Sequence, residues 1–145
     1  MKFTPEQPYP PDTEAGWFES LAGLARFLRS PNGCPWDRAH SSNDFAGFAL
    51  DEARELSDAL ASGDDRHAEE EFGDCLFTLF ACMAAAEAEG RFTLTSALQH
   101  AYEKMMRRHA HVFAAERAQT PEEAMNAWAI EKAREKKATC RDKQP

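Results

Sequence analysis

The chain has 145 residues, enough for one domain with a hydrophobic core. Its formal net charge of −8 argues against a general nucleic-acid binder and against a protein that lies on anionic membranes, because both need a basic face. No apolar run is long enough to cross a bilayer, and the four cysteines lack metal-ligand spacing and are typical of reduced thiols. We therefore expect a cytoplasmic protein without a membrane or nucleic-acid partner.

The N-terminal residues 1–11 are rich in proline and are expected to form an irregular arm. The helix-favouring composition and the absence of alternating β-branched runs predict an all-α fold, a bundle of about five helices. We expect this helical domain over residues 12–138, followed by a flexible tail at 139–145.

Hydrophobic spacing and capping residues predict where the helices lie. They are expected over about 13–29, 43–62, 65–89 and 94–109, with a fifth beginning after Thr120. Gly63 is expected to end the second helix, and Pro31 to Asp37 are predicted to form a turn-rich loop.

Some of the apolar residues are expected to face the core. In the third helix these include Phe72 and Leu79, and in the fourth helix they include Leu98 and Met105. The third helix is apolar on most sides, which is typical of a helix at the centre of a bundle or in a subunit interface.

Two acidic pairs with helical spacing dominate the sequence, Glu52 with Glu55 and Glu71 with Asp74. Residues three apart lie on one face of a helix, so each pair directs two carboxylates the same way. The link at Ser62–Gly63 is short, and helices joined by such links are normally antiparallel neighbours. Glu52 falls in the apolar stripe of its helix, where an unpaired carboxylate is costly, and four converging like charges require a divalent cation. The alternative is an ordinary solvated acidic face.

Oxygen ligands alone favour Mg²⁺, with Mn²⁺ as a substitute. A ferritin-like di-iron centre would need Glu-x-x-His motifs, and neither Glu52 nor Glu71 is followed by histidine at that spacing. Lys104 and Arg108, one helical turn apart, are suited to neutralise a pyrophosphate leaving group, although an ordinary basic rim is the alternative. The pattern favours metal-assisted hydrolysis of a phosphoanhydride.

Longer motifs join these residues. They are GCPWD at 33–37, E-x-x-E at 52–55, E-x-G-D at 71–74, EGRF at 89–92, K-x-x-R-R-H-x-H-V-F at 104–113 and a final Pro-Glu-Glu…Trp…Lys segment. With these motifs the chain resembles the MazG-type nucleoside triphosphate pyrophosphohydrolases over about residues 24–136. The resemblance implies an all-α NTP pyrophosphatase architecture completed by dimerisation, as a homodimer or a dimer of dimers.

The resemblance also implies the reaction and its residues. A metal-activated water would attack the α-phosphorus of a nucleoside triphosphate, releasing the monophosphate and pyrophosphate. The implied Mg²⁺ ligands are Glu52, Glu55, Glu71 and Asp74. The implied catalytic residues are Glu52, Glu55, Lys104 and Arg108. The implied substrate-binding residues are Trp36, Asp37, Lys104, Arg108, Trp128 and Lys132.

The sequence departs from the family pattern at two places. Asp51 stands where the family often has Glu, and the usual Asn-Trp-Glu near the C-terminus becomes Asn126-Ala127-Trp128-Ala129. A dUTP or phosphoribosyl-ATP pyrophosphohydrolase of the same superfamily is an alternative, although the CPWD loop and the basic segment favour the MazG branch. An alternative of another class is a non-catalytic helical interaction protein, which would tolerate substitution of Glu52.

Overall fold

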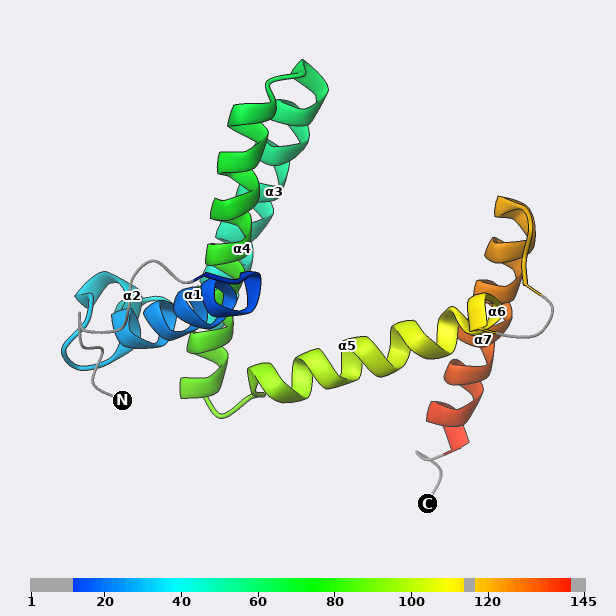
Figure 1. Ribbon diagram of the computed structural model, residues 1–145. Helices are drawn as coiled ribbons and strands as arrows, with labels where there is room; N and C mark the ends of the chain where they lie inside the picture. Colours follow the sequence, from blue (N-terminus) through cyan, green and yellow to red (C-terminus); the bar gives the residue numbers. More distant parts are fainter. Residues whose placement is uncertain (1–11, 114–116, 142–145) are drawn as a thin grey trace. The chain divides into compact units, whose positions relative to one another are not determined.

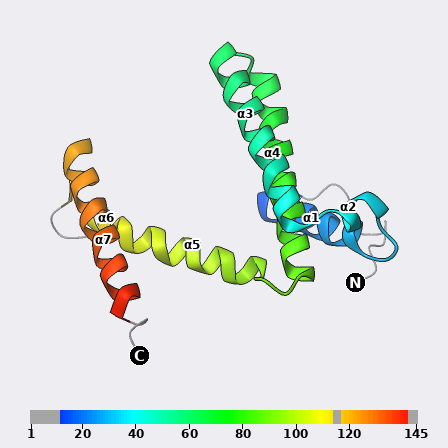
Figure 2. The same cartoon turned by 180° about the vertical axis from the view of Figure 1, so that it is seen from behind.

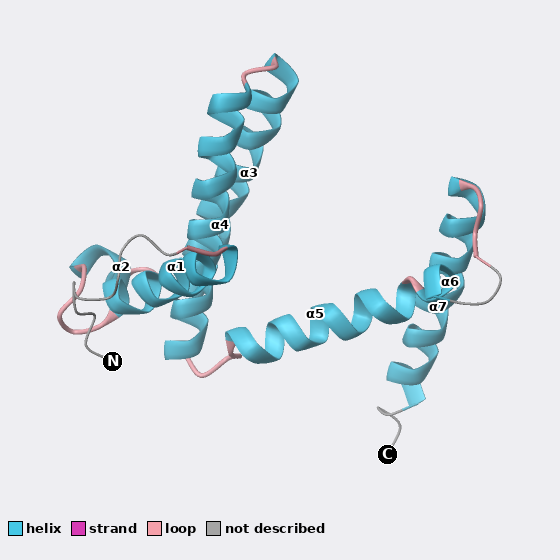
Figure 3. Cartoon of the chain, in the orientation of Figure 1, coloured by secondary structure: helices cyan, strands magenta, loops and turns pink. Residues whose placement is uncertain are grey.

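The computed structural model describes residues 12–113 and 117–141 (Figure 1). The helices are α1 (Glu14–Arg29), α2 (Pro35–Ala39), α3 (Ser42–Ser62), α4 (Asp65–Ala88), α5 (Leu94–Arg108), α6 (Ala110–Phe113) and α7 (Pro121–Arg141). Within these two ranges there is no strand (Figure 3), so the prediction of an all-α fold is confirmed. None of these helices is both long enough and apolar enough to span a membrane. The expected arm at 1–11 and residues 142–145 of the expected tail lie outside the described residues.

Local signals in the sequence fix the ends of the long helices. The Thr13 hydroxyl accepts a hydrogen bond from the Gly16 amide at 3.0 Å and caps α1. Ser41 caps α3 in a reciprocal capping box with Asp44. Gly63 ends the same helix with a φ of 76°, in the left-handed region that glycine adopts without strain. At these three predicted helix boundaries, residues close in the sequence therefore provide the hydrogen bonds or the backbone conformation that the helix end needs.

The loop predicted from Pro31 to Asp37 is wrong in its second half, because Pro35 begins the short helix α2. Proline suits the first position of a helix, since its φ is already helical and its missing N–H has no partner to lose. The guanidinium of Arg29 then holds the far end of α2 by donating to the carbonyls of Asp37 and His40, both at 2.7 Å. The helix α6 is also an addition to the five that the sequence predicts.

Contacts divide the chain into two compact units, residues 1–94 and 95–145. In the first unit α3 and α4 form a hairpin and lie side by side in both views (Figures 1 and 2), with α1 packed on α4. One core cluster consists of Ala22, Ala25, Phe80, Met83 and Ala84. A second consists of Phe45, Ala81 and Ala85. Alanine dominates both clusters, which lets the helix backbones approach closely.

Hydrogen bonds at the end of α4 connect it to the start of α3. The carboxylate of Glu89, just after α4, accepts hydrogen bonds from the amide and the hydroxyl of Ser42. The Cys82 thiol donates to the Ser42 carbonyl at 3.2 Å. Nearby, Glu87 pairs with Arg26 of α1 at 2.8 Å and accepts from the Leu94 amide at 3.0 Å. These contacts fix the position of α3 against α4 and therefore the position of the acidic residues on both.

Several residues expected in the core lie on the surface of the single chain. On α4, Phe72 is 61% exposed and Leu79 is 51% exposed. On α5, Leu98 and Met105 are also exposed, and this helix has no buried residue. The expectation that these side chains are buried was therefore wrong for the single chain. An apolar stripe predicts burial, but it does not show whether the same chain or another molecule covers it.

Candidate metal and nucleotide site

Three of the four carboxylates singled out in the sequence converge. Glu52 and Glu55 come from α3 and Glu71 from α4, and one ligand oxygen of each lies within 4.8 Å of the others. Asp74 is exposed and does not belong to this group of three. It is nevertheless close enough for its charge to contribute to raising the pKa of Glu52. The hairpin of α3 and α4 thus brings Glu71 together with Glu55 and Glu52, which lie 16 and 19 positions before it in the sequence.

The electrostatics of the cluster suit a cation. Burial is the largest cause that raises the pKa of Glu52, followed by the negative charges of Glu55, Asp74 and Glu71. Glu71 is the most buried member, with 7% of its surface exposed, although the sequence had suggested Glu52 for that place. A set of carboxylate oxygens without thiolate is the donor set that Mg²⁺ and Mn²⁺ prefer, so the residues present fit such an ion.

A histidine outside the predicted site residues, His67, lies next to Glu71. The Nε2 atom of His67 lies 2.8 Å from Oε1 of Glu71, one turn away on α4. The signal that was available is the spacing of four residues, which places the two side chains on one face. The imidazole holds one oxygen of the buried carboxylate and so orients the group within the cluster.

A cleft of about 390 Å³ lies beside Glu52. Its lining residues are Leu28, Trp36, Asp37, Phe45, Phe48, Asp51, Glu52, Phe77, Thr78 and Ala81. The Trp36 ring stacks on Phe48 with centroids 5.6 Å apart and lies 4.1 Å from the His40 ring. Trp36 is still 53% exposed. The cleft therefore offers an aromatic surface to a planar ligand next to the acidic cluster.

The aromatic wall of the cleft is formed by Trp36 and Phe48, and the segment before Trp36 is held by hydrogen bonds to its backbone carbonyls. Arg38 donates from Nη1 to the carbonyls of Ser30, Pro31 and Gly33, the first at 2.9 Å. A Cβ atom on Gly33 would lie 2.2 Å from the carbonyl oxygen of Phe27, so only glycine fits there. This close approach explains the glycine of the GCPWD motif and keeps Trp36 in a defined position.

In the second unit, the structure brings Arg108 and Trp128 together. The Arg108 guanidinium lies 5.2 Å from the Trp128 ring centroid and pairs with Glu135 at 2.7 Å. Lys104 and Lys132 have no ion-pair partner among the residues that the structure describes. Of the basic residues expected around the phosphates, Arg108 is therefore paired with an acid, whereas Lys104 and Lys132 are open to a ligand.

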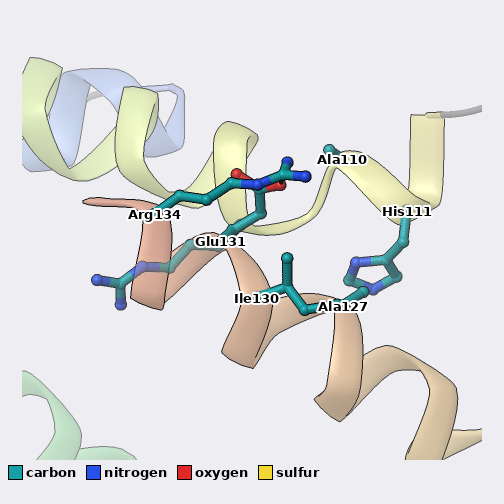
Figure 4. Close-up of a pocket in the computed structure, with 7 residues that line it drawn as sticks. Ala110, His111, Ala127, Ile130, Glu131 and Arg134 are labelled. Atoms are coloured by element: carbon teal, nitrogen blue, oxygen red, sulfur yellow. Dashed lines mark hydrogen bonds and ion pairs between the residues drawn. The ribbon is translucent and has the colours of Figure 1, made fainter. Parts of the chain in front are cut away.

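A pocket of about 240 Å³ lies between α6 and α7 beside this pair (Figure 4). Its lining includes His111, Ile130, Glu131 and Arg134. The Nδ1 atom of His111 is buried and has no hydrogen-bond partner among the described residues. Arg134 is paired with Glu131 at 2.5 Å, so the pocket carries little uncompensated positive charge.

Comparison with known proteins decides the family. Residues 41–113 match the MazG nucleotide pyrophosphohydrolase domain. The chain belongs to this family. A crystal structure of a MazG-related protein from Thermotoga maritima has a TM-score of 0.68 and 29% identity, covering 79% of this chain and 98% of that one.

Curated relatives of this MazG-family chain are longer proteins. It is 35% identical to the nucleoside triphosphate pyrophosphohydrolase/pyrophosphatase MazG of Thermotoga maritima, covering 85% of this chain and 47% of the relative. It is also 35% identical to the nucleoside triphosphate pyrophosphohydrolase of Escherichia coli K12, covering 76% and 42%. The uncharacterized protein YabN of Bacillus subtilis is 34% identical over 77% of this chain and 23% of its own length. The chain spans less than half the length of these relatives.

The segment matched by the MazG domain includes only part of the candidate site. It contains the four acidic residues and also Lys104 and Arg108. Trp36 and Asp37 precede it, whereas Trp128 and Lys132 follow it. The aromatic wall of the cleft is thus built by residues on both sides of the start of the MazG match, with Trp36 before it and Phe48 within it.

Proposed function

We propose that this chain hydrolyses nucleoside triphosphates to the monophosphate and pyrophosphate with the help of Mg²⁺ or Mn²⁺. The observation that carries the proposal is the convergence of Glu52, Glu55 and Glu71 beside an aromatic cleft. Metal-bound carboxylates next to a surface for a planar base are what a metal-dependent nucleotide hydrolase needs. The names of the Thermotoga maritima and Escherichia coli relatives support the same reaction class.

In this proposal the three converging carboxylates hold the cation, and Asp74 serves as the fourth ligand. When bound, the cation supplies a water of lowered pKa and polarises the phosphoryl oxygens. The water oxygen bonds to the α-phosphorus, the bridging bond between the α- and β-phosphates breaks, and pyrophosphate leaves with the electron pair. A carboxylate of the cluster receives the proton from the water.

The second unit has the charge that phosphates require. The acidic excess of the chain lies within residues 1–94, whereas residues 95–145 carry more basic than acidic side chains. We assign Lys104 and Arg108 to the phosphates, and Trp128 and Lys132 to the nucleotide. Arg108 exchanges its pairing with Glu135 for a phosphate in this proposal, because a guanidinium binds both anions in the same two-pronged way.

The test is an assay that separates monophosphate from pyrophosphate, run with a panel of triphosphates and with Mg²⁺ added to the metal-free protein. Glu55→Gln and Asp74→Asn should lower turnover at least 100-fold, while Asp58→Asn, an exposed change on α3, should not. Mg²⁺ at about 100 times its dissociation constant should also stabilise the fold by about 2.7 kcal/mol. A melting temperature indifferent to Mg²⁺ together with hydrolysis of no triphosphate would favour the non-catalytic alternative, whereas unchanged turnover in both variants would contradict the roles assigned to Glu55 and Asp74. A panel that responds only to dUTP or phosphoribosyl-ATP would favour the other branches.

We further propose that the protein works as a homodimer or a dimer of dimers. Large apolar side chains on α4, Phe72 and Leu79, are more than half exposed in the single chain, and Leu60 on α3 is 62% exposed. A second copy of the chain can cover such a face symmetrically. Light scattering of the protein should give a multiple of the 16.3 kDa chain mass, and Phe72→Arg should shift it towards the monomer. A wild-type protein that stays monomeric at high concentration would contradict the proposal.

A further inference from the structure

The polar lining of the cleft beside Glu52 is almost entirely made of hydrogen-bond acceptors. Asp37 from α2 and Asp51 from α3 contribute carboxylates, and Glu52 belongs to the metal cluster. Thr78 adds a hydroxyl whose proton is already donated to the Asp74 carbonyl at 2.7 Å. Of the side chains that line the cleft, only the indole of Trp36 keeps an N–H to donate.

The two aspartates that line the cleft have carboxylate oxygens that are open to a ligand. Asp51 pairs through one oxygen with Arg54 at 2.7 Å, and both groups of this pair are more than 60% exposed. Such an exposed pair is weak, and it leaves the other oxygen of Asp51 open to a ligand. For Asp37, only the backbone carbonyl takes part in a described hydrogen bond, to Arg29. A ligand in this cleft therefore meets acceptors that need protons.

We propose that the cleft binds the nucleobase of the substrate and that Asp37 and Asp51 select bases with an exocyclic amino group. This inference rests on the proposed function and adds the class of substrate. The base stacks on the exposed face of Trp36, whose position is fixed by Phe48 and His40. The two aspartates then accept hydrogen bonds from the amino group, as carboxylates do from the N4 amino group of cytosine.

Cytosine and uracil make the sharpest comparison because they have the same size. Cytosine presents an amino group where uracil presents a carbonyl oxygen. A carbonyl oxygen facing a carboxylate brings lone pairs together without a proton between them, and this is an unfavourable contact. The single N–H on the pairing edge of uracil lies between two carbonyl oxygens, so it cannot reach an aspartate without such a contact. Adenine and guanine both carry an amino group and belong to the accepted class.

The experiment compares CTP with UTP as substrates of the wild-type 145-residue chain loaded with Mg²⁺. We expect kcat/KM for CTP to exceed that for UTP by roughly ten- to a hundredfold. Asp37→Asn and Asp51→Asn each introduce an amide that can donate to the uracil carbonyl, so the CTP/UTP ratio should fall towards one. Asp58→Asn, on the same helix as Asp51 but outside the cleft, should leave the ratio unchanged.

A binding measurement keeps this inference separate from the catalytic proposal. In the metal-free protein, CMP should shift the NMR resonance of the Trp36 indole N–H at a lower concentration than UMP does. Equal hydrolysis of CTP and UTP by the wild-type protein would overturn the base selection and leave the proposed function intact. Hydrolysis of no triphosphate would defeat the proposed function, and equal binding of CMP and UMP would then overturn the base selection as well.

Discussion

The carboxylate of Glu89 accepts two hydrogen bonds from Ser42, from its amide at 2.7 Å and its hydroxyl at 2.6 Å. Ser42 is the first residue of α3, so a residue 47 positions away satisfies an amide that a helix start leaves without an intrahelical partner. Arg91 donates to the same hydroxyl at 2.8 Å. The pairing joins the end of α4 to the beginning of α3 and fixes the register in which their acidic residues face each other.

Replacing Glu89 should therefore loosen the hairpin. Glu89→Ala removes both acceptors and leaves the Ser42 amide and hydroxyl, in a residue that is only 4% exposed, without their partner. We expect a lower thermal unfolding midpoint and weaker Mn²⁺ binding, because the carboxylates lose their register. Glu70→Ala, an exposed change on α4, is the matched control and should have little effect on either measurement. An unchanged midpoint in the Glu89 variant would show that other contacts fix the register.

Stability should fall in acid because two structural carboxylates have lowered pKa values. The hydroxyl and amide of Ser42 lower the pKa of Glu89, and the Arg26 guanidinium lowers that of Glu87. Their stabilising effect is fully present above the usual value of 4.5 and is lost as the pH falls through the folded-state pKa. Urea unfolding between about pH 7 and pH 3 should show this loss. The double change to glutamine should flatten the pH dependence, and an equally steep dependence in that variant would contradict the assignment.

Two glycines should respond to alanine in opposite directions. Gly33→Ala places a Cβ atom within 2.5 Å of backbone atoms of Phe27 and Leu28, so we expect a loss of about 1–3 kcal/mol and a displaced Trp36. Gly47 lies inside α3 with no atom near the position of a Cβ. Gly47→Ala should stabilise the protein by roughly 0.5–1 kcal/mol, because alanine has the higher helix propensity. Chemical unfolding of both variants checks this, and a Gly33→Ala protein as stable as wild type would rule out the tight approach.

The imidazole of His67 should strengthen metal binding through Glu71. His67→Ala removes the imidazole whose Nε2 atom lies 2.8 Å from the buried carboxylate and orients it, so Mn²⁺ affinity should fall by about 10–100-fold. His67→Gln keeps a donor and should recover part of the loss. Electron paramagnetic resonance titration of free Mn²⁺ measures the affinity directly, without relying on turnover. His100→Ala, an exposed change on α5, serves as the control, and equal affinity in all these proteins would remove His67 from the site.

Much of the fold can be predicted from local sequence signals. The features that the sequence does not predict depend on contacts between residues distant in the chain. The starts and ends of α1, α3 and α4 follow from capping residues such as Thr13 and Gly63, which act within a few positions. The convergence of carboxylates from α3 and α4 could be expected from the spacing and the short link. The short helix α2 could not, because Arg29 stabilises it from another helix.

The degree of burial was harder to anticipate than helical position. Glu71 and not Glu52 is the buried carboxylate, since its depth depends on how the helices pack and not on the stripe of one helix. The exposure of Phe72 and Leu79 has a similar cause, because an apolar face does not reveal what will cover it. The spacing of four residues predicts that His67 and Glu71 lie on one helix face. The predicted site was based on the acidic pairs alone and therefore did not include His67.

The thiol of Cys82, which donates to the Ser42 carbonyl, has a chemical consequence for the α3–α4 junction. Burial, followed by the charge of Glu89, raises its pKa. Only a thiolate reacts readily with alkylating agents, so this sulfur is sluggish at neutral pH for as long as the junction stays closed. Its rate of alkylation consequently reports how often the two helices separate transiently, and mass spectrometry can measure that rate.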